Sequence, residues 1–179
     1  GVIATAGLKN SWRNRLVTSQ SGTTDLQLRD DTENFITDQR MLFNSLVAFG
    51  LDFGEHTIRW TNLYIRDTRK QASLANTYQF EDNFDVVTQN TAWYERQLID
   101  SQVVGEFEFG PLSLDLRGGY ARTDREAPYN LTFNYVRTNL DTPTGNYYVA
   151  NVTGNQIQNV DPISSVFEDL QEELWFGGI

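Results

Sequence analysis

Apolar and polar residues alternate along VVGEFEFGPLSLDLRGGY, residues Val103–Tyr120, on both sides of a Gly-Pro pair. Successive side chains of a β-strand point to opposite faces, so this period of two predicts two strands, each with one apolar face. A short turn at Gly110 and Pro111 would pair Phe107 with Leu114. The apolar residues of the two strands would then lie on the same face of the sheet. The predicted apolar face consists of Val103, Gly105, Phe107, Phe109, Leu112, Leu114, Leu116, Gly118 and Tyr120.

Other segments of the chain carry the same signal. Residues 2–15 and 41–53 alternate clearly, and a last strand begins near Glu172. Residues 57–70 alternate more weakly, because Leu63 and Ile65 stand opposite Trp60, and a β-bulge there would restore a single apolar face. Together with the hairpin, these segments predict an all-β fold of about six long antiparallel strands connected up and down.

The connections between these strands differ strongly in predicted length. Polar, turn-rich segments predict loops at about 18–39, 71–91 and 127–171, whereas the turns near Gly54 and Gly110 take about two residues. The alternating patterns persist for about twelve to eighteen residues, while strands of soluble sheets average about five or six. Long strands with long loops at one end and short turns at the other are typical of outer-membrane β-barrels.

We therefore expect residues 1–179 to form part of one transmembrane β-barrel domain. In such a barrel the apolar face contacts lipid, which predicts that Phe107, Leu112, Leu114 and Leu116 face the membrane. The smallest membrane barrels have about eight strands, so the remaining strands are expected elsewhere in a longer protein. The abrupt start and end of the chain fit that expectation.

Composition narrows the possible functions. The chain has 179 residues with 24 Asp and Glu against 14 Lys and Arg, so attraction to nucleic-acid phosphates is not expected. Absence of cysteine excludes disulfides and thiolate metal sites, and His56 is the only histidine, so no metal site and no cofactor is predicted. Neighbouring carboxylates such as Glu106 and Glu108 share a strand face rather than opposing each other across a cleft, so no enzymatic activity is predicted.

One stretch also resembles a known family. WYERQLIDSQVVGEFEFGPLSLDLRGGYARTDREAPYNLTFNY, residues Trp93–Tyr135, resembles the middle barrel strands of TonB-dependent outer-membrane receptors through ERQL, GGYARTDREAP and the short turn. Those receptors have a barrel of about 22 strands filled by a plug, and they import scarce ligands with energy from TonB. The resemblance implies a location in the bacterial outer membrane. It also implies as partners outer-membrane lipid, the remaining strands and plug of the same receptor, TonB acting through an N-terminal part outside this chain, and a small extracellular ligand.

Five aromatic residues in the predicted loop 127–171 are candidate ligand-binding residues. Flat amphipathic rings suit sugars, chelates and similar uptake substrates, although they would equally pack the loop or lie at the membrane interface. Acidic groups at Arg29–Glu33 and Glu81–Asp85 lack the spacing of an EF-hand, so solvated loops are expected there. The aromatic candidates are Tyr129, Phe133, Tyr135, Tyr147 and Tyr148.

A soluble all-β sandwich that binds carbohydrate is the alternative. Its apolar face would then be the core between two sheets. The unequal loops and the long strands argue against this alternative, and neither interpretation identifies the ligand.

Overall fold

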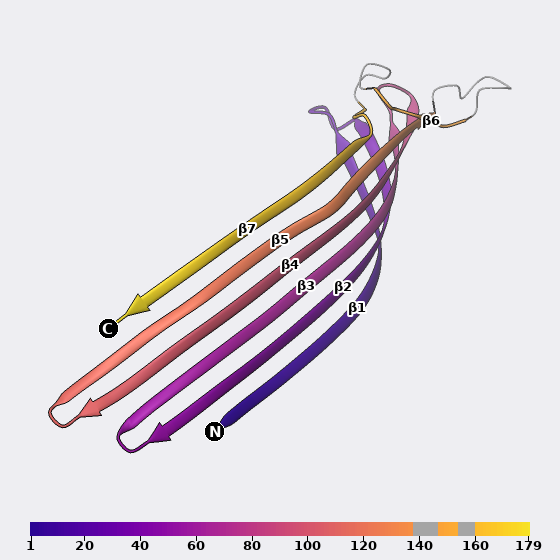
Figure 1. Cartoon of the computed structure of the whole chain (residues 1–179). Helices are drawn as coiled ribbons and strands as arrows, with labels where there is room; N and C mark the ends of the chain where they lie inside the picture. Colours follow the sequence, from indigo (N-terminus) through magenta and orange to yellow (C-terminus); the bar gives the residue numbers. More distant parts are fainter. Residues whose placement is uncertain (138–146, 154–159) are drawn as a thin grey trace.

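The computed structural model of the chain is a single layer of antiparallel strands (Figure 1). The structure describes residues 1–137, 147–153 and 160–179. The strands are β1 (Val2–Gly22), β2 (Leu28–Phe53), β3 (His56–Gln79), β4 (Phe84–Phe109), β5 (Leu112–Arg137), β6 (Val149–Ala150) and β7 (Ser164–Gly178). Consecutive strands pair from β1 to β6, and β7 pairs with β5. The predicted all-β, antiparallel up-and-down sheet is confirmed.

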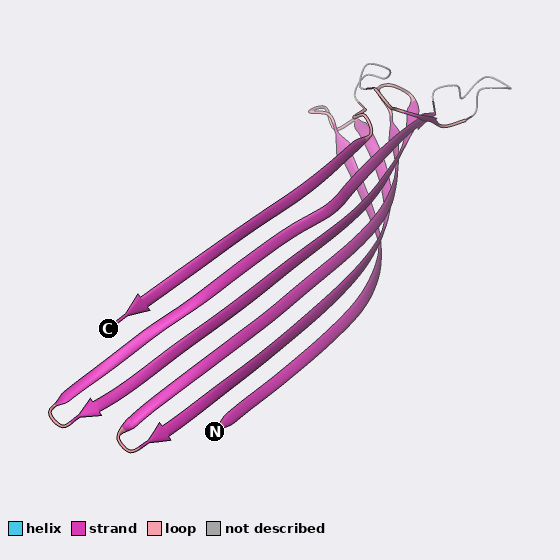
Figure 2. Cartoon of the chain, in the orientation of Figure 1, coloured by secondary structure: helices cyan, strands magenta, loops and turns pink. Residues whose placement is uncertain are grey.

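The sheet is open, with β1 at one edge and β6 and β7, which both pair with β5, at the other. Figure 2 shows the strands running side by side, with both tight turns at one end of the sheet and the longer connections at the other. Both chain ends lie at the end that carries the tight turns (Figure 1). We call this the turn end and the opposite one the distal end.

The predicted hairpin is present in the predicted register. Phe107 pairs with Leu114, Gly105 with Leu116 and Val103 with Gly118. The turn that joins the arms contains Gly110 with a φ of 62°, and the equivalent turn between β2 and β3 contains Gly54 with a φ of 66°. L-residues with a side chain rarely adopt this left-handed backbone, so glycine is the residue that permits both two-residue turns.

The loops predicted at 18–39 and 71–91 are wrong. β1 continues to Gly22 and β2 begins at Leu28, while only residues 80–83 separate β3 from β4. These extensions carry polar residues on both faces and apolar ones such as Phe84 and Val86 only at irregular positions, so they lack the regular contrast from which a strand is recognised. Ladder hydrogen bonds and cross-strand polar pairs hold them instead, such as Thr32 with Thr77, whose hydroxyl oxygens are 2.9 Å apart.

The third predicted loop, 127–171, is also too long at both ends. β5 continues through Arg137, and β7 begins at Ser164 rather than near Glu172. Pro128 lies at a register shift, where Trp93 pairs with Tyr129 but Glu95 pairs with Glu126. Proline has no N–H to donate, and a bulge is a position in a strand where that loss is tolerated.

The bulge suggested within residues 57–70 is absent, since β3 pairs with β2 and β4 without a register shift. Leu63 and Ile65 therefore lie on the face opposite Trp60. There Leu63 pairs with Leu46, and Ile65 with Leu98, which forms a small apolar cluster on that face.

Burial is slight, as expected of one layer. The core cluster among the described residues lies at the distal end and consists of Phe84, Val86, Val136 and Val160. No second sheet packs on the first within the described ranges, so the two-sheet core of a sandwich is not present there.

Candidate functional site

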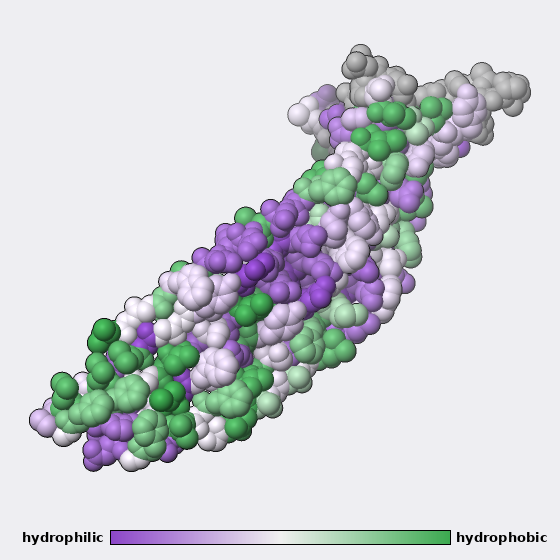
Figure 3. Space-filling model, in the orientation of Figure 1, coloured by the Kyte–Doolittle hydropathy of each residue, from purple (hydrophilic) through white to green (hydrophobic). Residues whose placement is uncertain are grey.

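One face of the sheet carries a continuous apolar surface at the turn end. We call the face that bears Phe107 and Leu114 face A, and the other face B. On face A the apolar residues cover 2–8 of β1, 41–53 of β2, 58–64 of β3, 99–109 of β4, 112–120 of β5 and 175–177 of β7. This apolar band is highly exposed, since Leu8 is 70% and Trp175 73% accessible. Figure 3 shows hydrophobic side chains at the turn end and hydrophilic ones across the middle.

The four residues predicted to face lipid lie together on this band. Phe107 is opposite Leu114, and Leu112 and Leu116 are 62% and 38% exposed. The ring of Phe107 covers Gly105, where a Cβ atom would come within 2.7 Å of that ring. Gly105 therefore allows an aromatic ring to lie flat along the strand, in the manner by which aromatic side chains compensate glycines in sheets.

The distal boundary of the band crosses the strands obliquely. On β1 the continuous part of the band ends at Leu8, with exposed Trp12 standing apart beyond Asn10, and pairing across β2, β3 and β4 places Leu8 level with Asp124 on β5. The band ends on β5 at Tyr120, four residues nearer the turn end, after four steps between strands. At the turn end, Phe107 is level with His56, yet β4 continues two residues further to Phe109.

The distal boundary thus shifts by four residues over four steps, and the turn end by two residues over the two steps from β2, which ends at Phe53 opposite His56, to β4, so both shift by about one residue per strand. With about 3.3 Å per residue and about 4.8 Å between strands, this shift corresponds to a tilt of roughly 35°. Strands of β-barrels tilt by roughly 35–45° from the barrel axis, so the stagger of the band has the size that such a tilt would produce.

Aromatic rings mark both boundaries. At the turn end, His56 lies 5.2 Å from Phe53 and 5.0 Å from Phe109 between ring centroids, and its Nδ1 accepts a hydrogen bond of 3.2 Å from the Glu108 amide. At the distal boundary, Tyr120 contacts Trp175 at 4.4 Å. The lone histidine is thus one ring of an aromatic row and not part of a metal cluster.

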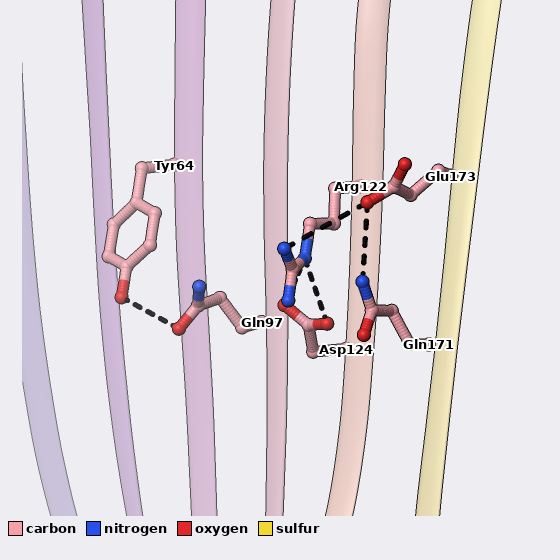
Figure 4. A network of polar contacts seen from close by, with 6 residues as sticks. All are labelled: Tyr64, Gln97, Arg122, Asp124, Gln171 and Glu173. Carbon is pink, nitrogen blue, oxygen red and sulfur yellow. Dashed lines mark hydrogen bonds and ion pairs between the residues drawn. The ribbon is translucent and has the colours of Figure 1, made fainter.

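Ion pairs begin on face A immediately beyond the band. Figure 4 shows the Tyr64 hydroxyl donating a hydrogen bond to Gln97, and Arg122 turned toward Asp124 and Glu173. The Arg122 Nε lies 3.0 Å from the Asp124 carboxylate, and this hydrogen bond raises the pKa of Arg122. On β3, β4, β5 and β7, face A therefore changes from apolar to charged beyond the band without any break in the sheet.

The five predicted ligand-binding aromatics do not share a loop. Tyr129, Phe133 and Tyr135 lie on β5, on face A, because the bulge at Pro128 moves the odd-numbered residues to that face. The ring of Tyr129 meets Trp93 edge-on at 5.8 Å. Tyr147 and Tyr148 are exposed in the segment before β6, and Tyr148 lies 5.6 Å from the Arg137 guanidinium.

Face B carries charged residues that the sequence reasoning did not single out. Asp38 accepts hydrogen bonds from Arg15 at 2.7 Å and from Arg69 at 3.1 Å. Burial raises the pKa of the Asp38 carboxyl, but the hydrogen bonds from the two arginines outweigh it, so the pKa lies below its ordinary value. The sequence signal for these residues is charge at every second position, as in Asp67 and Arg69. These positions lie at the ends of the predicted strands, where the alternation that identifies a face stops.

A second ion pair on face B joins β2 to β3. Arg40 donates two hydrogen bonds to Asp67, of 2.9 Å and 2.8 Å. These bonds lower the pKa of the Asp67 carboxyl, burial partly opposes them, and the charges of Arg96 and Arg69 lower it further. Asp38 and Asp67 are therefore both held in their charged form.

The described ranges contain neither a metal-binding cluster nor a membrane-spanning helix. They contain no group of three or more His, Asp or Glu side chains that could hold a metal ion. Of the two acidic groups considered for calcium, one contributes Asp30 and the other Glu81 to ion pairs with Arg29. None of the described segments forms a helix of the length and apolarity that crossing a membrane requires.

No protein-family model matches the chain, and no curated protein matches it.

Proposed function

We propose that the chain is a segment of a TonB-dependent outer-membrane receptor, which captures a scarce extracellular ligand and imports it with energy supplied by TonB. The observation that carries this proposal is the apolar band on face A. The largest apolar patch of a soluble monomer is typically about 300–600 Å². Here large hydrophobic side chains are exposed on every long strand, so lipid is the medium in which this face is stable.

The dimensions of the band support a membrane wall. It spans nine residues on β5 (112–120) and eleven on β4 (99–109), which is the roughly 9–11 residues that a membrane strand requires. At about 3.3 Å per residue and a tilt of roughly 35°, these lengths correspond to about 24–30 Å, close to the apolar height of about 25 Å in outer-membrane barrels. Aromatic rows at both boundaries agree with the girdles of such barrels.

The positions of the turns give the orientation of the sheet relative to the two sides of the membrane. Outer-membrane barrels have short periplasmic turns, so the turn end faces the periplasm and the distal end faces outward. The strands then continue beyond the membrane, where water reaches both faces, and this explains the ion pairs on face A beyond the band. The receptor family itself is supported by the resemblance of residues 93–135, and capture of ligand is assigned to the outward part of the sheet.

Cysteine labelling of the full-length protein in intact outer membranes tests this proposal. Leu114→Cys on face A should react with a lipid-soluble maleimide and resist a charged one, because its side chain lies in lipid. Asp115→Cys on face B is the matched control and should show the reverse preference. If position 115 prefers the lipid-soluble reagent and position 114 the charged one, the assignment of faces is wrong. A protein absent from the outer-membrane fraction would refute the proposed function.

A further inference from the structure

Arginine side chains gather on face B, although the protein as a whole is acidic. The net charge is −10, yet one hollow of about 620 Å³ is bordered by five arginines and two aspartates, a local balance of 5 − 2 = +3. The hollow spans β1 to β5 and lies beyond the apolar band. Its lining residues are Ser11, Arg13, Asp38, Arg40, Asp67, Arg69, Gln71, Tyr94, Arg96 and Arg125. We call its five arginines the arginine cluster.

Like charges oppose each other directly within this cluster. Arg40 is the cross-strand partner of Arg69. Arg96 is the cross-strand partner of Arg125 in a neighbouring row. Like charges placed directly opposite destabilise a sheet, and here the arrangement occurs twice. A negatively charged occupant would convert both repulsive pairs into attractive contacts.

The carboxylates of the sheet balance only part of this charge. Asp38, Asp67 and Glu168 pair with Arg69, Arg40 and Arg125. Arg13 and Arg96 lie across from Asp38 and Asp67 on neighbouring strands but form no ion pair with them in the described part of the chain. Donors thus remain available around the hollow.

Tyr94 adds a hydroxyl donor. Its oxygen accepts a hydrogen bond of 3.2 Å from the Asn130 amide, which leaves its own proton free to donate. Arginine presents planar pairs of N–H groups that match the two oxygens of a carboxylate or phosphate. The arginines and Tyr94 provide donors on five adjacent strands, β1 to β5.

We infer that the arginine cluster binds a small solute carrying two or more carboxylate or phosphate groups. A single anionic group cannot contact both opposed arginine pairs at once, whereas a solute with several can. The inference deepens the proposed uptake function and rests on it for the direction of transport. In the proposed receptor, the cluster lies on the water-facing wall of the sheet, beyond the membrane on the extracellular side, where it would meet an anion arriving from outside the cell. The binding itself is measurable in detergent.

The test is calorimetric titration of the full-length protein in detergent micelles with citrate and pyrophosphate as anionic probes and maltose as the neutral probe. The wild type should bind at least one anion and not maltose. Arg96→Gln should weaken anion binding by about tenfold or more, because it removes an arginine that lacks an ion pair. Arg59→Gln makes the same change on the same face, ten residues from Arg69 along β3 and thus about 33 Å away, and should alter affinity less than twofold.

Asp67→Asn separates anion binding from a purely structural role. It removes a negative charge and releases Arg40, so anion affinity should increase by several-fold, even though an ion pair of the sheet is lost. Arg96→Lys keeps the charge without the planar fork and should lie between the wild type and Arg96→Gln. Retained β-structure in circular dichroism ensures that folded variants are compared.

Three results would overturn the inference: no binding of either anion, equal loss for Arg59→Gln and Arg96→Gln, or weaker binding by Asp67→Asn. The labelling experiment at positions 114 and 115 distinguishes this failure from failure of the proposed function. Arginine-dependent anion binding by a protein outside the membrane would support the anion site and reject the receptor. A membrane-embedded protein that binds neither anion would support the receptor and reject the anion site.

Discussion

Leu116→Arg should be the most informative single change in stability. Leu116 lies on face A opposite Gly105, four residues from either end of the band on β5. At about 3.3 Å per residue and a tilt of roughly 35°, it lies about 11 Å from either boundary and thus close to the midplane. An arginine at the midplane of an outer-membrane barrel costs roughly 2–4 kcal/mol, because a charged group must be kept in hydrocarbon.

The matched control is Gln102→Arg on β4. Gln102 is exposed on face B, within the part of β4 that the band spans, and it pairs with Gly119 rather than with a charged residue. On a face in contact with water, the same arginine should change the free energy of unfolding by less than about 0.5 kcal/mol. The two variants therefore differ in the face that they occupy.

The assay is urea unfolding of the full-length protein in phosphatidylcholine vesicles, followed by tryptophan fluorescence. A loss of roughly 2–4 kcal/mol for Leu116→Arg with little change for Gln102→Arg is the expected pattern. Equal losses, or a loss below about 0.5 kcal/mol for Leu116→Arg, would refute the assignment of face A to lipid, because a side chain exposed to water tolerates arginine.

Two further predictions concern acid stability and strand packing. The pKa of Asp67 is lowered from 3.8 in the folded state, so its ion pair stabilises the fold above that pH and is lost as pH falls through the lower folded value. Asp67→Asn should therefore reduce stability near pH 7 and reduce its further loss below pH 3.8, as urea unfolding at both pH values would show; an unchanged acid profile would contradict this. Gly105→Ala should cost about 1 kcal/mol because its Cβ would lie 2.7 Å from the Phe107 ring, whereas Gly50→Ala meets no atom within 4 Å and should cost nothing. Equal midpoints for the two alanine variants would count against the packing of Phe107.

The sequence predicted the hairpin around Gly110 with its register, because one of its faces is consistently apolar and a shift by one residue would place Glu108 where Phe107 belongs. The distal halves of the strands were missed for the converse reason. Around Thr32 and Thr77 both faces are polar, so the alternation that identifies a strand disappears although its hydrogen bonds do not.

The charged and aromatic residues were harder to place, because their neighbours depend on register. Arg40 and Arg69 are distant in sequence and become partners only through the pairing of β2 with β3. Tyr129 was placed in a loop, because the bulge at Pro128 interrupts the alternation along β5. A period of two therefore identifies the part of a strand that has one apolar face, while single bulges and cross-strand contacts require the structure.

The central claim is that face A of the band contacts lipid and face B contacts water. Spin labels placed singly at residues 112–120 of the full-length protein, reconstituted in vesicles, test it most directly through their collision rates with oxygen and with a water-soluble nickel complex. Oxygen accessibility should peak at Leu112, Leu114 and Leu116 and nickel accessibility at the odd-numbered positions between them. High nickel accessibility at the even-numbered positions within the band would contradict the claim.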